Sequence, residues 1–290
     1  MLWIPITVAA TGLQVARNAL QRGLLAGAGP WGASLVRFLY GLPFSLLFFG
    51  LALALSPRAH PRLSAGFFLA CAIGGGAQIV ATASMLVSMR RSSFALGTVF
   101  QQSSIPLAAL FGLVLGERLG VAKWLGLALT TCGLMWLGWP RDRQRDWSAA
   151  GLGLLAGAGF AIASNSFRQA ALSLDHGDPL LAAQITVFVV QATQSAFLIT
   201  LLALSDRGAL HVAVTSWRES VPAGFFGAAA SGLWFTAFAM APVGPVRAVG
   251  VIEMPIAALA GRRMFAERLT PRQITAAMVT AFGVALAALG

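Results

Sequence analysis

The stretch SFALGTVFQQSSIPLAALFGLVL (93–115) and the residues that follow it decide the fold. This apolar run is interrupted at Gly116-Glu117-Arg118-Leu119 and then continues as a second apolar run to Gly138. Each run is long enough to cross a bilayer as a helix, which takes about 20 residues. The pattern therefore predicts a hairpin of two membrane-spanning helices, joined at the Gly-Glu-Arg-Leu break.

The end of the chain repeats this plan. An apolar run (245–265) is broken at Ala266-Glu267-Arg268-Leu269 and continues to residue 289, and PLAALFG (106–112) corresponds to PIAALAG (255–261). Glu117 corresponds to Glu267 and Gly133 to Gly283. The offset is 149 before the break and 150 after it, so the second copy has one inserted residue. A repeated apolar hairpin is typical of transporters built from two halves.

The composition is that of an integral membrane protein. Of the 290 residues, 58% are hydrophobic and 10% are charged, whereas soluble domains contain about 25% charged residues. We predict an all-α membrane protein of ten transmembrane helices, with no soluble domain. Their approximate ranges are 2–20, 30–55, 64–89, 93–115, 119–138, 148–173, 179–204, 217–240, 245–265 and 270–289, with a loop from Ser205 to Ser216.

The most polar stretch (140–147) separates the two predicted halves, 1–139 and 148–290. The sequence Ala65-Gly66-Phe67-Phe68 recurs as Ala223-Gly224-Phe225-Phe226, in the matching helix of the second half. A five-helix unit ends on the opposite side of the membrane from where it starts. The second half is therefore expected to be inserted upside down, which creates a site between the halves that can open to either side.

The chain resembles the drug/metabolite transporter superfamily, EamA type. The resemblance rests on the break Leu115-Gly116-Glu117-Arg118-Leu119, on Val36-Arg37-Phe38-Leu39 in the second helix, and on Glu253-Met254-Pro255 in the ninth. The family pattern has Glu and Pro adjacent, whereas Met254 separates them here. The resemblance covers essentially the whole chain. It implies export or exchange of small metabolites, such as amino acids or drugs, across the bacterial inner membrane by alternating access.

Two charges are predicted to lie within the membrane. An acid near mid-membrane, such as Glu253, is costly and normally faces a cavity or a partner. It could exchange protons, bind a cationic group, or pair with Arg247 or Arg37. Arg37 could counter a substrate carboxylate or Glu253, or extend to the interface. Glu117 and Glu267 are interpreted as structural residues that cap the hairpins.

Amides, a hydroxyl and one indole form the predicted substrate-binding set. Such side chains either line a common polar cavity or join helices by hydrogen bonds. The set consists of Gln14, Asn18, Gln78, Gln101, Gln102, Asn165, Gln194, Trp234 and Thr236.

Other functions find no support in the sequence. The net charge of +11 comes mostly from basic residues at segment ends, where they reach lipid headgroups, so no nucleic-acid partner is predicted. The three histidines lack zinc spacing and no nucleophile elbow occurs, so we predict no metal, no cofactor and no enzyme. The expected partners are a small-molecule substrate and the bilayer. The sequence does not predict the oligomeric state.

Several alternatives remain open at this point. A phosphorylated-metabolite exchanger would need several cations in its cavity, for which Arg37, Arg17 and Arg168 are candidates. A non-transporting scaffold would need no cavity. Transport could be coupled to protons, or could proceed by facilitated diffusion or exchange. Loop charges place both termini outside by the positive-inside rule, whereas the family resemblance implies both inside, the orientation we favour.

Overall fold

The computed structural model describes residues 1–56, 61–92, 101–138, 147–174, 178–253, 256 and 271–289. Within these ranges the chain is helical, without strands. The helices of the first half are α1 Trp3–Leu39, α2 Leu42–Leu55, α3 Ala65–Arg91, α5 Ser104–Val114 and α6 Val121–Gly138. Those of the second half are α7 Trp147–Leu174, α8 Pro179–Ser205, α9 Arg207–Thr215, α10 Trp217–Met240, α11 Val243–Val249, the 3-10 turn η1 Gly250–Ile252, and α13 Pro271–Leu289.

In the described part of the chain, five helical spans are long and apolar enough to cross a membrane: Gly27–Leu55, Ala65–Arg91, Trp147–Leu174, Pro179–Ser205 and Trp217–Met240. This finding supports the predicted membrane class. Of the ten predicted crossings, those near 104–114, 243–252 and 274–287 are represented by shorter apolar helices in the described residues.

The first two predicted helices are present, but the first continues beyond residue 20 as far as Gly29, and the second begins at Pro30 as predicted. Helical structure continues from Trp3 to Leu39 and reverses at Gly29, whose φ of 64° lies in the left-handed region. Glycine adopts this conformation without steric cost, and Pro30 then begins the next segment with its fixed φ. The chain therefore turns at a single residue, with no intervening loop.

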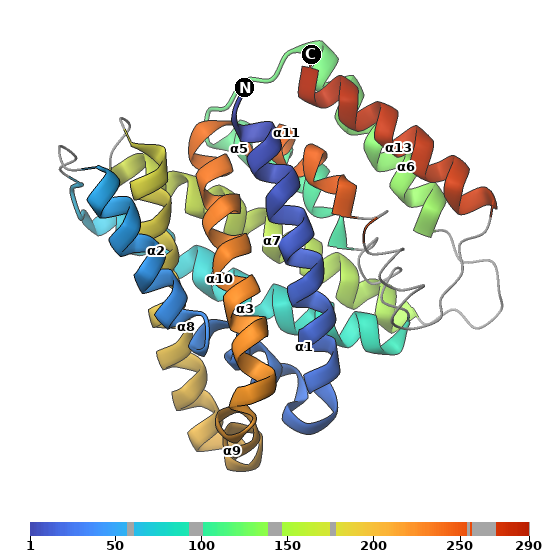
Figure 1. Cartoon of the computed structure of the whole chain (residues 1–290). Helices are drawn as coiled ribbons and strands as arrows, with labels where there is room; N and C mark the ends of the chain where they lie inside the picture. Colours follow the sequence, from blue (N-terminus) through green and yellow to red (C-terminus); the bar gives the residue numbers. More distant parts are fainter. Residues whose placement is uncertain are drawn as a thin grey trace.

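The predicted loop from Ser205 to Ser216 also proves to be largely helical. Asp206 accepts a hydrogen bond from the backbone N–H of Ala209 at 2.9 Å, which caps the first turn of α9. An aspartate at this position satisfies a donor that would otherwise lack a partner within the helix. In Figure 1, α9 lies at the end of the bundle, beyond α8 and α10.

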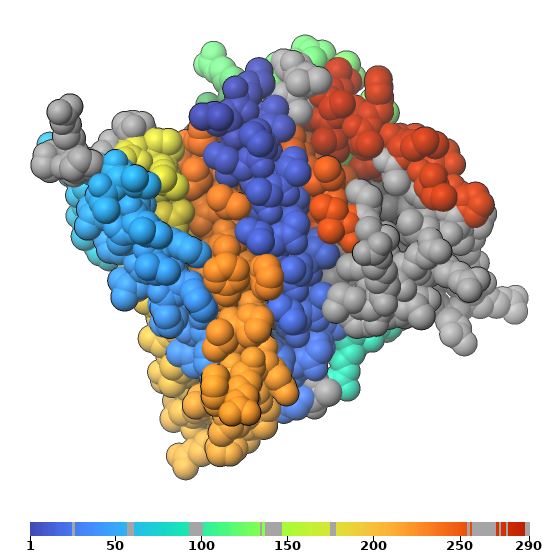
Figure 2. Space-filling view, viewed as in Figure 1, coloured from blue at the N-terminus to red at the C-terminus, as the bar shows by residue number. Residues whose placement is uncertain are grey.

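Polar and apolar residues are distributed in the reverse of the soluble pattern. Large apolar side chains point outward, such as Leu69 at 63% and Phe197 at 57% exposed, whereas Arg17 and Arg37 are each only 2% exposed. Lipid hydrocarbon can surround the outward-facing apolar side chains, whereas the buried arginines need polar partners inside the bundle. On the face seen in Figure 2, α1 and α10 lie side by side and form a continuous surface.

Three helix pairs make the most extensive contacts: α3 with α7, α1 with α10, and α6 with α13. The last pair stands at one side of the bundle (Figure 1). Its contact is reciprocal. A Cβ added to Gly133 would lie 2.3 Å from Thr280 Oγ1, and one added to Gly283 would lie 2.5 Å from the Thr130 backbone nitrogen. Both glycines therefore allow a close approach of the two backbones.

Replacing either glycine with alanine should force α6 and α13 apart. We expect Gly133→Ala and Gly283→Ala each to lower the free energy of unfolding by about 1–3 kcal/mol, the usual cost of overpacking. Gly151→Ala is the matched control, because no atom lies within 4 Å of its added Cβ. Thermal unfolding of the purified protein in detergent would measure the three. Equal stability of all three variants would contradict the close packing.

The predicted hairpin break is present. The chain leaves α5 at Val114 and enters α6 at Val121, and Gly116 has a φ of 88°. Glu117 forms a salt bridge with Arg168 Nε at 2.6 Å, and Arg168 also donates to the carbonyls of Phe238 and Ala241. Glu117 thus joins this turn to α7 and to the end of α10. Glu267 and most of the linker that divides the predicted halves lie outside the described residues.

Candidate functional site

Among the described residues, four charged side chains are buried in the interior of the bundle. Arg17 and Arg37 lie on α1, Arg247 lies on α11, and Glu253 follows η1. Arg247 is 7% exposed and Glu253 is 2% exposed. A buried charge needs hydrogen-bonding partners or a counter-ion, since its hydration is lost. The partners of these groups therefore indicate what the site can hold.

Glu253 is held by three amides. Its Oε2 accepts from Gln14 Nε2 at 2.7 Å and from Gln102 Nε2 at 3.2 Å, and its Oε1 accepts from Asn18 Nδ2 at 3.2 Å. Gln14 and Asn18 are one turn apart on α1, so they share a face. The carboxylate thus connects α1, the residues preceding α5, and the segment after η1.

Glu253 makes no direct ion pair with an arginine in the described part of the chain. Arg17 reaches it through Asn18, whose Oδ1 accepts from Arg17 Nη2 at 2.6 Å and from Nε at 3.1 Å. The Asn18 amide therefore lies between guanidinium and carboxylate and hydrogen-bonds to both. Such a chain of hydrogen bonds is strengthened by mutual polarisation in a low-dielectric interior.

Arg37 is held by hydroxyl groups. Its Nη1 donates to Thr82 Oγ1 on α3 at 3.1 Å and its Nη2 to Ser231 Oγ on α10 at 3.3 Å. Its Nε is buried and has no hydrogen-bond partner. Gly227 of α10 faces the stem of Arg37, where an added Cβ would lie 3.1 Å from Cγ. The α10 backbone therefore leaves room for this side chain.

Arg247 lies among aromatic rings. It donates to Ser164 Oγ of α7 at 2.6 Å from Nη2 and at 3.0 Å from Nε. Its guanidinium carbon is 5.1 Å from the ring centre of Trp234 and 5.6 Å from those of Phe160 and Phe238. A cation at this distance from an aromatic ring is attracted to it, more strongly where water is excluded.

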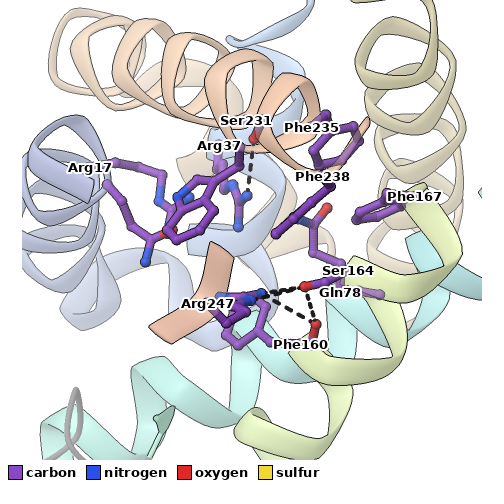
Figure 3. Close-up of a pocket in the computed structure, with 13 residues that line it drawn as sticks. Arg17, Arg37, Gln78, Phe160, Ser164, Phe167, Ser231, Phe235, Phe238 and Arg247 are labelled. Atoms are coloured by element: carbon purple, nitrogen blue, oxygen red, sulfur yellow. Dashed lines mark hydrogen bonds between the residues drawn. The ribbon is translucent and has the colours of Figure 1, made fainter. Parts of the chain in front are cut away.

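One cavity brings the three arginines together (Figure 3). In this view Phe167, Phe235 and Phe238 lie to one side of Arg17 and Arg37, and Phe160 lies beside Arg247. The remaining lining residues are Gln14, Gln78, Phe160, Ala163, Ser164, Ser231 and Trp234. The space that the centre of a water molecule can occupy is about 20 Å³, enough for about one water. The cavity is therefore narrow and almost filled by its own side chains.

The other predicted site residues occupy different positions. Gln78 and Trp234 line the cavity, and Gln194 supports Gln78 by donating to its Oε1 at 2.9 Å. Asn165 donates to the Ala108 carbonyl of α5 at 3.1 Å and so joins two helices. Thr236 donates to the carbonyl of Gly232 in its own helix. Gln101 is buried but does not line this cavity.

The sequence analysis names Arg247 only as a possible partner of Glu253, and it leaves the phenylalanines out of the predicted site. Arg247 follows the Pro242-Val243-Gly244-Pro245 turn, a position typical of a loop charge at a segment end. The structure instead makes this turn the start of the buried helix α11. The phenylalanines carry no signal of their own in a chain with 19 of them.

The comparisons with known proteins identify the fold alone. No family model matches the sequence, and neither does any curated protein. A solved structure described only as "Crystal structure of protein" aligns with a TM-score of 0.65 at 16% identity, over 100% of this chain and 96% of that chain. The whole chain thus adopts an arrangement of helices known from experiment. Together, the fold and the site define an all-helical protein with five membrane-length helices and a buried, positively charged cavity.

Proposed function

We propose that the protein is a secondary transporter of small organic solutes that works by alternating access, a member of the drug/metabolite transporter superfamily acting as an exporter in the bacterial inner membrane. The observation that carries this proposal is the narrow cavity, whose lining comes from α1 and α3 of the first half and from α7, α10 and α11 of the second. Its charged residues lie on α1 and α11. Polar sites between the two halves are typical of such carriers.

The proposal includes ten crossings in two inverted five-helix repeats. Reciprocal packing of α6 against α13 supports this arrangement: Gly133 contacts Thr280, and Gly283 contacts Thr130. Gly133 and Gly283 are 150 positions apart, and so are Thr130 and Thr280. A two-fold axis produces such isologous contacts. The helix contacts follow the same symmetry. If the two halves are exchanged, α1 corresponds to α7 and α10 to α3, so the α1–α10 contact corresponds to the α7–α3 contact. The N-terminus and the end of α13 lie at the same end of the bundle (Figure 1), as an even number of crossings requires.

Glu253 offers a means of proton coupling. Its two oxygens accept from three amide N–H groups. Protonation turns one oxygen into a donor, which then faces a donor. Protonation therefore weakens the hydrogen bonds that Gln14, Asn18 and Gln102 donate to Glu253. In this proposal, these hydrogen bonds help to keep the cavity narrow. In the proposed cycle, Glu253 takes up a proton while the cavity is open to one side of the membrane and releases it while the cavity is open to the other side.

Two rival functions are weighed against the same features. A non-transporting scaffold has no need for buried arginines around a cavity, since each one lowers its stability unless it is compensated. A phosphorylated-metabolite exchanger needs several cavity cations, and Arg17, Arg37 and Arg247 provide them. The second rival remains a transporter, with a narrower range of substrates.

The proposal is tested by uptake into proteoliposomes with labelled amino acids, nucleosides, aromatic acids and cationic drugs, with and without a pH gradient. We expect at least one solute to accumulate with the gradient. Glu253→Gln should reduce gradient-driven accumulation by about tenfold or more, in the range of one strong interaction to a charged group, while counterflow without a gradient persists.

Glu219→Gln is the matched control, because Glu219 is exposed in the first turn of α10. Unchanged gradient dependence in Glu253→Gln would make Glu253 structural and the protein a uniporter or exchanger. Failure of the folded protein to move any solute of a broad panel would sink the transport proposal and favour the scaffold.

A further inference from the structure

Among the described residues, the three arginines around the cavity outnumber the buried acid Glu253, which does not line it. Arg17, Arg37 and Arg247 line it, and each accepting atom they use is neutral: an amide oxygen, hydroxyls and a backbone carbonyl. Buried cations held by neutral groups alone are poorly compensated for their lost hydration. An anion among them would complete the site.

Two residues of the lining also carry buried donors without partners. Arg37 Nε and Trp234 Nε1 have no hydrogen-bond partner among the described residues, and their residues are 2% and 5% exposed. Both residues line the cavity. More than nine-tenths of buried polar groups in proteins are satisfied, so an unsatisfied donor beside a cavity calls for an explanation. A ligand that accepts hydrogen bonds provides one.

No carboxylate of the described residues lines the cavity. Glu253 is absent from its lining, and both its oxygens are engaged by amides. A cationic or zwitterionic substrate would place its ammonium group among three guanidiniums without an acid to balance it. Like charges in a low-dielectric site repel strongly. The lining therefore selects against amines.

Much of the cavity lining is aromatic, including rings that lie close to Arg247. Phe167 and Phe235 stack with ring centres 4.2 Å apart, and Trp234 and Phe238 stack at 5.5 Å. Flat apolar ligands bind such rings by offset or edge-to-face contact. This lining thus complements a planar apolar group rather than a flexible polar one.

Resting on the proposed transport function, we infer that the substrate is a small organic anion with a flat apolar ring. Its anionic group, a carboxylate or a phosphate, binds between Arg17, Arg37 and Arg247 and accepts from Arg37 Nε. Its ring lies against Phe167, Phe235, Trp234 and Phe238. Because the cavity now admits about one water molecule, the side chains that line it move apart when the substrate enters.

The test compares three ligands that share the indole ring and differ in the charge of the attached group. Isothermal titration of the full-length protein in detergent is performed with indole-3-acetate, tryptophan and tryptamine, and with acetate as the anion without a ring. We expect indole-3-acetate to bind at least about tenfold more tightly than the other three, the effect of one charge-assisted contact. Benzoate and phenyl phosphate then determine which anionic group is preferred, and tighter binding of either supports an anion site.

Variants locate the site. Arg37→Gln should weaken indole-3-acetate binding at least about tenfold, and Trp234→Phe, which keeps a ring but loses the N–H, should weaken it less. Arg218→Gln, the same change at an exposed arginine beside Trp217, should leave it unchanged. Thermal unfolding confirms that each variant is folded. Tryptamine binding as tight as that of indole-3-acetate, or full affinity in folded Arg37→Gln and Trp234→Phe, would overturn the inference.

Flux in proteoliposomes separates this inference from the proposed function. If indole-3-acetate binds in an Arg37-dependent manner but does not cross the membrane, the anion site stands and the transport proposal falls. If tryptamine or a neutral solute crosses and no anion binds, the transport proposal stands and the anion inference falls.

Discussion

Glu253→Leu is expected to lower the free energy of unfolding by about 3–5 kcal/mol, the loss seen when one member of a buried charged network is removed. Leucine has nearly the volume of glutamate but accepts no hydrogen bond. Gln14, Asn18 and Gln102 would each lose the acceptor for a buried amide N–H. The three buried arginines would also lose the only acid that is buried with them in the described part of the chain.

Thermal or denaturant unfolding in mild detergent would measure this loss. Glu253→Gln keeps the shape and one acceptor, so it should be destabilised clearly less than Glu253→Leu. Glu219→Leu is the matched control at an exposed acid and should stay within about 0.5 kcal/mol of the parent. A leucine variant as stable as the parent would mean that the amide cluster around Glu253 contributes nothing to the fold.

The long helices were predictable because apolar length and boundary residues agree. The sequence predicts 148–173, 179–204 and 217–240, and the structure has α7 Trp147–Leu174, α8 Pro179–Ser205 and α10 Trp217–Met240. Hydrocarbon thickness sets a length that composition alone reveals. Helix α9 was not predicted, because only nine residues separate Asp206 from Ser216. A search for membrane-spanning apolar segments does not detect so short an amphipathic helix.

The site could be predicted residue by residue but not as an assembly. Gln14, Asn18, Gln102 and Glu253 each stood out as polar groups in apolar segments. Their meeting at one carboxylate depends on contacts between residues 151 to 239 positions apart, which no local pattern specifies. Arg247 was misplaced for a related reason: whether a cation at a segment end faces lipid headgroups or the interior depends on how the helix packs.

A repeated sequence does not impose repeated packing, and the Ala-Gly-Phe-Phe motif makes this testable. In the first copy, a Cβ on Gly66 would meet only Ser64 Oγ, at 3.7 Å, and the residue is exposed. In the second copy, a Cβ on Gly224 would lie 2.4 Å from the Tyr40 carbonyl carbon and 2.5 Å from its oxygen. These are backbone atoms at the end of α1, which cannot rotate away as a side chain would.

Gly224→Leu should therefore force α10 away from α1, one of the three most extensive contacts in the bundle, at a cost of more than about 3 kcal/mol. Gly224→Ala should cost about 1–3 kcal/mol, since a single methyl group still requires the backbones to separate. Gly66→Leu, the same change in the matching copy, should remain within about 0.5 kcal/mol of the parent, because its side chain extends outward. Unfolding in detergent, together with the fraction of monodisperse protein after expression, measures all three. Equal tolerance at both positions would show that α1 and α10 do not approach this closely. Equal intolerance would show that Gly66 has a packing role as well.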